Sequence, residues 1–294
     1  MLLFFECEPK AARRFSVHRP FTSYIICATQ RSGSTLLCEA LKNTNLAGYP
    51  EEYFDALKST GVPRRPLEYF SEILDEELIA IFKGRERPDE EQRQPPPGMS
   101  YQDYLEHAIK ISTSPNGVFG TKVMWGYFPD FISKLRDIPQ YQELPTTTLL
   151  STIFPDPHYI YVTRRDKIGQ AISLWKALQT WVWRKEDVTN NIGPTRHLYF
   201  HFRAIDHLVQ LIEQYEESWQ QFFAEHDIQP FTIVYEELVE TYEATLRAVL
   251  RELNIAVPAN LIVRNGKLQR QADELSTSWI QQYNFMKQAA QVTL

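Results

Sequence analysis

The sequence predicts an α/β protein with a central parallel sheet and helices on both of its faces. Three short apolar runs that favour strands, at 23–28, 158–163 and 231–234, alternate with longer segments whose hydrophobic residues recur at helical spacing. Strands without a polar face are typical of parallel sheets, because helices cover both sides of such a sheet. Ligands are therefore expected at the carboxyl edge of the sheet.

The other elements follow in chain order. Residues 1–20 have mixed charges and no clear period, which predicts an extension outside the core, whereas 21–294 show no repeat or boundary and are expected to form one domain. A further strand is expected at 118–125, and Pro-rich or polar stretches predict surface loops at 84–98 and 184–194. Helical spacing predicts helices over 36–41, 67–82, 101–111, 129–150, 168–178, 205–222 and 242–253, and around Trp279.

The composition narrows the classes of partner. The 294 residues have a net charge of -6 and no evident basic face, which argues against nucleic acid as a partner. No apolar run approaches the length of a membrane span, so we expect no stable membrane insertion. The cysteines have no framework spacing, and Cys27 and Cys38 fall in apolar segments as core residues, so a reducing cytoplasm is the expected compartment. His197 and His201 have metal-ligand spacing but no obvious third ligand, so no metal is expected.

The stretch 23–41 predicts an anion site. An apolar strand ends at Ala28, a loop of small hydroxyl residues follows, and helical spacing resumes at Leu36. The free backbone N–H groups and the positive end of the helix dipole then face one point, and an arginine and three hydroxyls add donors. The candidate anion-binding residues are Gln30, Arg31, Ser32, Gly33, Ser34 and Thr35.

This loop differs from two common phosphate-binding motifs. It has one glycine and no following lysine, so it is not a Walker loop, and it lacks the three glycines of the dinucleotide fingerprint. It resembles instead the loop that binds the 5′-phosphosulfate in sulfotransferases. The alternative is a structural strand–turn–helix corner whose serines cap the helix.

A second cationic cluster follows the strand at 158–163. Arg164 and Arg165 come at the carboxyl end of that strand, and Ser173 lies one to two turns into the next helix. Their spacing matches the Arg…Ser pair that binds the 3′-phosphate in sulfotransferases. The alternative is an arginine pair that caps a turn and pairs with Asp166.

Several segments together resemble the trehalose 2-sulfotransferase family, in the same order along most of the chain from Tyr24 onward. The resemblance implies a P-loop-like sulfotransferase fold. It also implies a reaction that moves the sulfuryl group of 3′-phosphoadenylyl sulfate (PAPS) to a sugar hydroxyl and releases 3′,5′-ADP, without a metal. The segments that carry it are 30–37, 48–54, 115–125, 164–180, 183–184 and 268–273.

The resemblance also implies roles for particular residues. Glu52 matches the general base of the family, and Arg270 and Gln271 lie in a stretch that resembles the one closing over the nucleotide. One departure stands at Tyr49, where the trehalose enzyme has an acidic sugar-binding residue. We therefore expect the acceptor to be a carbohydrate or glycolipid hydroxyl, with poor turnover on free trehalose.

The residues around Glu52 support an acceptor site of this class. Adjacent side chains usually diverge, so only one of Glu51 and Glu52 should face the site, and Glu51 is the rival base. Lys122 is a further candidate cation for the leaving group, together with Arg31. Aromatic faces for the sugar are expected from Tyr49, Tyr53, Phe54 and Trp125.

Two other functions remain open at this point. A non-catalytic nucleotide-binding protein would have the same loop without a productive base, and a P-loop-type kinase would need the lysine and the Walker-B aspartate that the sequence lacks. The oligomeric state is also open, with a homodimer as one option.

Overall fold

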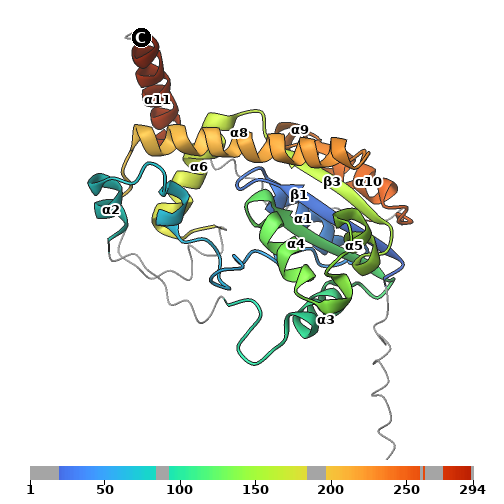
Figure 1. The fold of residues 1–294 in the computed structure, drawn as a ribbon. Helices are drawn as coiled ribbons and strands as arrows, with labels where there is room; N and C mark the ends of the chain where they lie inside the picture. Colours follow the sequence, from blue (N-terminus) through green and yellow to red (C-terminus); the bar gives the residue numbers. More distant parts are fainter. Residues whose placement is uncertain (1–19, 84–92, 184–196, 259–260, 262–273, 293–294) are drawn as a thin grey trace, which may run out of the picture.

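The computed structural model describes residues 20–83, 93–183, 197–258, 261 and 274–292. Its centre is a parallel sheet in the order β2-β1-β3-β4, as Figure 1 shows. β1 (Thr22–Ala28) pairs with both β2 (Val118–Met124) and β3 (Pro157–Thr163), and β3 pairs with β4 (Phe231–Val234). The predicted α/β class with a parallel central sheet is confirmed.

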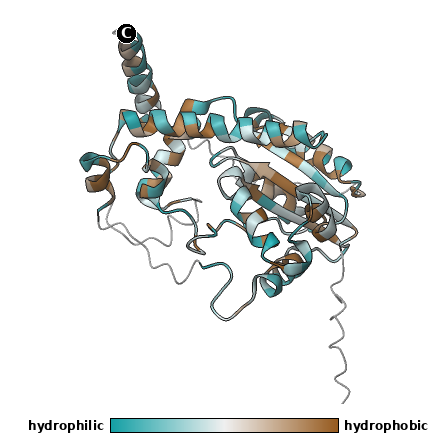
Figure 2. Ribbon diagram, viewed as in Figure 1, coloured by the Kyte–Doolittle hydropathy of each residue, from teal (hydrophilic) through white to brown (hydrophobic). Residues whose placement is uncertain are grey.

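Successive residues of the central strand face opposite sides of the sheet, and each side has its own core. Ile25 and Cys27 pack with the helices α3, α4, α5 and α8, whereas Tyr24 and Ile26 pack with α1, α9 and α10. These are the two helix layers that the uniformly apolar strands predicted, and in Figure 2 the strands are mostly brown. The helices of the two layers are α1 (Ser34–Thr44), α3 (Tyr101–Ser112), α4 (Phe128–Arg136), α5 (Thr146–Ile153), α8 (Phe202–Glu225), α9 (Tyr235–Glu240) and α10 (Tyr242–Glu252).

A third cluster of buried residues lies beside the sheet. It joins α8 to α6 (Lys167–Thr180), α2 (Glu76–Phe82) and α11 (Glu274–Val292), with Trp175 fully buried among them. Most of the hydrophobic residues at helical spacing in the predicted helix 205–222 lie in the core, and one of them, Trp219, also donates from Nε1 to the carbonyl of Ala28 at 3.0 Å. This bond holds α8 at the carboxyl end of β1, where the anion-binding loop begins.

Two predicted helices are interrupted in the structure. The span 67–82 divides into a 3-10 helix at Pro66–Phe70 and α2, because Asp75 accepts from the backbone N–H of Leu78 and so caps a new helix start. The span 129–150 is broken after α4 by Pro139 and Pro145, since proline lacks the N–H that a continuous helix needs.

The cysteines and the strand β2 lie close to where the sequence placed them, whereas other predicted segments lie outside the described residues. Cys27 and Cys38 are buried free thiols, as expected, and burial raises the pKa of Cys38 to about 12. The strand expected at 118–125 ends one residue earlier, and Trp125 starts a short 3-10 helix. The extension and most of the predicted loops fall in residues that the structure does not describe.

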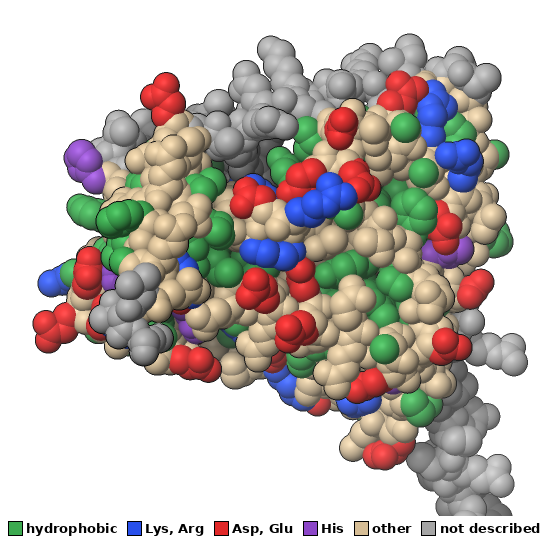
Figure 3. All heavy atoms as spheres, turned by 90° about the horizontal axis from the view of Figure 1, so that it is seen from above, with side chains coloured by type: hydrophobic (Ala, Val, Ile, Leu, Met, Phe, Trp, Pro, Cys, Tyr) green, Lys and Arg blue, Asp and Glu red, His purple; other side chains and the backbone are tan. Residues whose placement is uncertain are grey.

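The surface of the described residues is mixed in charge. On the face in Figure 3, acidic and basic side chains are interspersed. No helix in the described part of the chain is long and apolar enough to span a membrane.

Candidate active site

The loop after β1 turns sharply into α1. Arg31 and Gly33 have positive φ angles of 63° and 92°, and α1 begins at Ser34. A Cβ on Gly33 would lie 2.3 Å from the ring of Tyr235, so only glycine fits at this turn. The first N–H groups of α1 therefore point to the carboxyl edge of the sheet, which creates an anion site.

Residues from α6 brace the loop. Gln170, which is fully buried, donates from Nε2 to Thr29 Oγ1 at 2.9 Å and to the carbonyl of Gln30 at 2.7 Å. Arg31 donates from Nε to Ser173 Oγ at 2.9 Å and from a terminal nitrogen to the carbonyl of Trp183 at 2.7 Å. The structure thus joins Arg31 and Ser173, which the sequence assigned to two separate anion sites.

Two donors at this edge are buried without a hydrogen-bond partner among the described residues: Ser32 Oγ and Arg164 Nε. The guanidinium of Arg164 lies over the ring of Tyr235, 4.9 Å from its centroid, and its far nitrogen is 3.3 Å from Asp166. Because the same tyrosine ring packs against Gly33, Arg164 is held close to the loop. Unsatisfied buried donors of this kind are typical of a site that binds an anion.

The two arginines that follow β3 differ in their surroundings. Arg165 is mostly exposed and forms an ion pair with Glu237, and its backbone N–H donates to Glu236 at 3.1 Å. Burial opposes the charge on Glu236, but hydrogen bonds from backbone N–H groups, including those of Arg165 and Asp166, hold its pKa below the usual value. Only Arg164 therefore lies by the loop, whereas Arg165 is engaged at the surface.

The segment 48–52 runs along the outer edge of β2. Gly48 has a φ of 69°, and a Cβ there would lie 2.7 Å from the carbonyls of Ser112 and Val118. Tyr49 N donates to the carbonyl of Ser112, at the end of α3, at 2.8 Å, and Lys122 N on β2 donates to the carbonyl of Glu51 at 3.0 Å. This pairing sets Glu52 beside Lys122.

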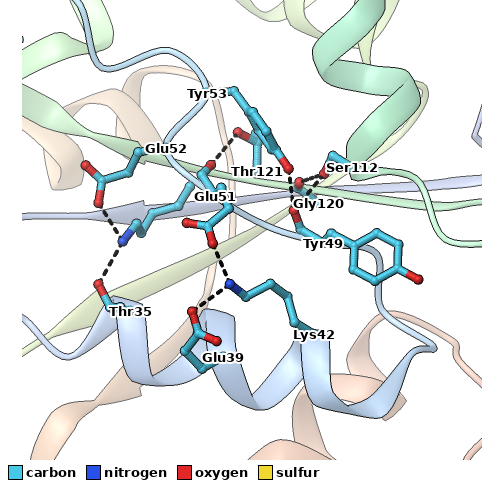
Figure 4. Close-up of polar contacts among 11 residues, drawn as sticks. Thr35, Glu39, Lys42, Tyr49, Glu51, Glu52, Tyr53, Ser112, Gly120 and Thr121 are labelled. Atoms are coloured by element: carbon cyan, nitrogen blue, oxygen red, sulfur yellow. Dashed lines mark hydrogen bonds and ion pairs between the residues drawn. The ribbon is translucent and has the colours of Figure 1, made fainter. Parts of the chain in front are cut away.

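A chain of polar contacts links Glu52 to the loop. Lys122 is 1% exposed, and its Nζ lies 2.6 Å from Glu52 Oε1 and donates to Thr35 Oγ1 at 2.9 Å. Figure 4 shows Glu52 and Thr35 joined by dashed lines to the same nitrogen atom. Burial opposes the charge on Lys122, but the Glu52 carboxylate raises the pKa of Lys122 above its usual value. The lysine is therefore charged at neutral pH and holds the carboxylate against the first turn of α1.

The neighbouring carboxylate has different partners. Glu51 pairs with Lys42, which also contacts Glu39 at 2.6 Å on α1. Burial opposes the charge on Lys42, but the hydrogen bonds from both glutamates raise the pKa of Lys42. Glu51 and Glu52 thus have different lysine partners, and Figure 4 shows Glu51 beside Lys42. Both carboxylates nevertheless line the same cavity, so the prediction that only one of them faces the site is not borne out.

A cavity of about 500 Å³ connects these groups. Its wall includes Gln30, Arg31 and Thr35 from the loop and both glutamates from the segment 48–52. The loop and Glu52 therefore open onto one space, which is large enough for a ring-sized molecule.

Comparison with known proteins identifies the family of this chain. The sequence profile of the family described as Stf0 sulphotransferase matches residues 23–285. The chain belongs to the Stf0 sulfotransferase family. It is 31% identical over 270 residues to the trehalose 2-sulfotransferase of Mycolicibacterium smegmatis (strain ATCC 700084 / mc(2)155), covering 89% of this chain and 94% of that protein.

Two further similarities complete the comparison. A trehalose 2-sulfotransferase of Mycobacterium tuberculosis (strain ATCC 35801 / TMC 107 / Erdman) is 31% identical over 271 residues, which cover 90% of this chain and 95% of that protein. The crystal structure of the sulfotransferase STF9 from Mycobacterium avium has a TM-score of 0.40 and 10% identity, covering 89% of this chain and 68% of that one.

The aromatic residues that were predicted to face a sugar have other surroundings in the structure of this Stf0 protein. Phe54 is 3% exposed and stacks on Phe131 with ring centroids 4.4 Å apart, so it is a core residue and offers no face to a sugar. Trp125 packs edge-on against Trp219 at 4.9 Å and contributes nothing to the cavity wall. Apolar burial explains both positions, because these rings lie over the sheet face that α4 and α8 cover.

The two predicted tyrosines are also turned from the cavity. The hydroxyl of Tyr53 donates to the carbonyl of Tyr49 at 2.8 Å, and the ring of Tyr49 points away from Glu52 (Figure 4). Neither residue is part of the cavity wall. The tyrosine at position 49 therefore offers no stacking face inside the cavity.

Sequence reasoning missed several residues of the cavity wall. They come from scattered segments that carry no motif, so only the proximity of Asp55 to Glu52 offered a signal. Arg64, one of them, lies over the ring of Tyr69 at 5.3 Å and donates to Tyr215 Oη at 2.7 Å. The missed residues are Asp55, Pro63, Arg64, Tyr69, Gln94, Met124, Tyr127 and Trp181. Arg270 and Gln271, predicted to contact the nucleotide, lie outside the described residues.

Proposed function

We propose that this chain transfers the sulfuryl group of PAPS to a carbohydrate hydroxyl, on a sugar or a glycolipid, with Glu52 as the general base and 3′,5′-ADP as the product. One observation carries the proposal. The carboxylate of Glu52 and the first turn of α1 are joined through Lys122 and open onto one cavity. A base and an anion site that share a cavity are what a group transfer to a hydroxyl requires.

The residues present fit a nucleotide with phosphates at both ends. The N–H groups at the start of α1, with Ser32, Ser34 and Thr35, would hold the 5′-phosphosulfate, and Arg164 with Ser173 would hold the 3′-phosphate. The unpartnered Ser32 Oγ and Arg164 Nε are the donors that such phosphates would satisfy. Arg270 and Gln271 remain proposed contacts on the family resemblance alone, whereas Arg165 is exposed and paired with Glu237 and is not expected to hold the nucleotide.

The reaction is an in-line displacement at sulfur, for which bound PAPS supplies the sulfuryl group. A bond forms between the acceptor oxygen and sulfur, and the bond from sulfur to the 5′-phosphate oxygen breaks. Glu52 takes the proton of the attacking hydroxyl. Lys122 and Arg31 stabilise the negative charge that develops on the leaving side, since both are fixed cations at the loop.

The acceptor class rests on the relatives and on the cavity. The two relatives of this chain are named as trehalose 2-sulfotransferases. The cavity wall combines carboxylates with the rings of Tyr69 and Trp181, a mixture that suits a polyhydroxylated ring. We further propose that residues 21–294 act as one domain in the cytoplasm, without a metal ion.

The direct test is transfer from labelled PAPS. The protein would be incubated with [³⁵S]PAPS and a panel that contains trehalose, simple glycosides, glycolipids, a phenol and a tyrosine peptide. Label on at least one sugar, with better turnover on another glycoside than on free trehalose, is the expected result. Label on the phenol or the peptide but on no sugar would contradict the acceptor class.

A binding measurement separates the alternatives. A ligand that binds only the native state raises the melting temperature, so 3′,5′-ADP should stabilise the protein and ATP with Mg²⁺ should not. The reverse result would favour a kinase. Stabilisation by 3′,5′-ADP without transfer to any acceptor would favour a non-catalytic nucleotide-binding protein.

A further inference from the structure

A third carboxyl group lines the cavity on the same segment as the proposed base. Asp55 lies three residues after Glu52, and Gln94 donates from Nε2 to Asp55 Oδ1 at 2.6 Å. The backbone N–H of Gln94 donates to the carbonyl of Gly61 at 2.7 Å, which fixes the backbone from which the side-chain amide extends. The other end of this amide, Gln94 Oε1, is buried without a hydrogen-bond partner among the described residues.

The surroundings of Asp55 do not neutralise its charge. None of the ion pairs formed by the described residues includes Asp55. Burial, followed by the charge of Glu52, raises the pKa of Asp55 to about 7, although Gln94 and Lys122 oppose this shift. Asp55 is partly buried, and a carboxylate that loses water without gaining a cationic partner destabilises a fold, so its place on the cavity wall indicates a role in binding.

The groups that face Asp55 come from four neighbouring elements. Lys122 lies on β2, Tyr104 on α3 and Tyr127 on the 3-10 helix Trp125–Tyr127, and both tyrosines stay neutral because burial raises their pKa values. Lys134 on α4 donates to the carbonyl of Ala56 at 2.6 Å, and burial lowers the pKa of Lys134 to about 8. Asp55, with a pKa of about 7, and Lys134, with a pKa of about 8, are thus the groups of this set that change charge near neutral pH.

We propose that Asp55 is a specificity-determining residue, whose carboxylate, positioned by Gln94, accepts a hydrogen bond from a hydroxyl of the acceptor that does not react. The proposal rests on the proposed function, because it needs a polyhydroxylated acceptor. Glu52 holds the reacting hydroxyl and Asp55 a neighbouring one, so the pair orients the ring in the cavity. The free Gln94 Oε1 offers a further acceptor beside it.

The test compares the parent with Asp55→Asn on the best sugar found with labelled PAPS and on its monodeoxy derivatives. We expect KM for the parent sugar to rise about 10-fold or more in Asp55→Asn, with kcat within a few-fold, because the lost bond serves binding. The parent should have a higher KM for one monodeoxy derivative than for the full sugar, whereas Asp55→Asn should have similar KM values for the two. The parent's KM should also fall as pH rises through about 7, a dependence that Asp55→Asn should lose.

Controls separate the possible failures. Asp227→Asn removes an exposed carboxylate that is not part of the cavity wall, at a φ of 52° that asparagine tolerates, and should leave KM and discrimination unchanged. Unchanged 3′,5′-ADP binding by Asp55→Asn would show that the variant is folded. Unaltered KM and unaltered discrimination in a folded, active Asp55→Asn would overturn the proposal, whereas failure of the parent to label any sugar would overturn the proposed function instead.

Discussion

The two sides of the cavity are built differently. On the donor side, the loop is contiguous in sequence and is braced by buried partners such as Gln170 and Tyr235. On the acceptor side, a short segment along β2 supplies Glu52, but the rest of the wall comes from residues as far apart as Arg64 and Trp181. A contiguous loop can be recognised from spacing alone, whereas a wall assembled from distant segments cannot.

This contrast has a chemical reason. The donor side must present backbone N–H groups, and backbone geometry demands particular residues such as glycine at position 33. The acceptor side uses side chains, and the backbone that carries them does not demand particular residues. We therefore expect substitutions on the donor side to affect nucleotide binding, and those on the acceptor side to affect turnover or sugar choice.

The largest effect should come from the base. Glu52→Gln keeps the shape of the side chain but cannot accept the proton, so turnover should fall ~10²–10⁴-fold. Binding of 3′,5′-ADP should be nearly unchanged, as measured by calorimetry alongside labelled-sulfate transfer.

Glu51→Gln is the matched control for this variant. Glu51 is bound to Lys42 and not to Lys122, so its loss should cost turnover much less. If Glu51→Gln lost the activity and Glu52→Gln retained it, the roles of the two carboxylates would be exchanged.

A smaller but distinct effect is expected at Lys122, where the two sides meet. Lys122→Met removes a cation that contacts both Glu52 and the first turn of α1, and kcat should fall ~10²–10³-fold, as for loss of one stabilising donor. Lys42→Met, which removes the neighbouring lysine from Glu51, is the control in the same assay. Equal losses in both lysine variants would point to a structural role.

Substitution of the two arginines after β3 tests which of them binds the 3′-phosphate. Arg164→Ala should weaken the binding of 3′,5′-ADP by ~1.5–3 kcal/mol, or roughly 10–150-fold in affinity, because a buried charged donor is lost. Arg165→Ala should change the affinity by less than about threefold, since that side chain is exposed and paired with Glu237. A titration that shows the reverse order would place the 3′-phosphate at Arg165.

The smallest effect is one of stability, at Asp55. Its pKa is raised by burial to about 7, so the folded state holds a proton that the unfolded chain releases near pH 4, and stability falls as pH rises between these values. At pH 8, Asp55→Asn should be more stable than the parent by about 1 kcal/mol or more, because one pKa unit corresponds to about 1.4 kcal/mol. Melting curves at pH 4.5 and pH 8 measure this, and an equal difference in Tm at both would contradict it.

The sequence predicted the fold more fully than the site. Apolar strands and helical stripes are set by local pattern, so the sheet and most helices could be located, and the errors fell at local breaks such as Asp75 and Pro139. The loop and Glu52 were recognisable because they are contiguous motifs. The aromatic residues around Glu52 were misjudged, since a ring such as Phe54 suits a core as well as a sugar and only the packing of α4 decides.

The measurement that tests the account most directly is a crystal structure with 3′,5′-ADP and the best acceptor. We predict the 5′-phosphate at the first turn of α1 within hydrogen-bond distance of Ser32 Oγ, the 3′-phosphate at Arg164, and the reacting hydroxyl facing Glu52. A nucleotide bound elsewhere, or an acceptor hydroxyl that faces Glu51 at this edge of the sheet, would contradict it.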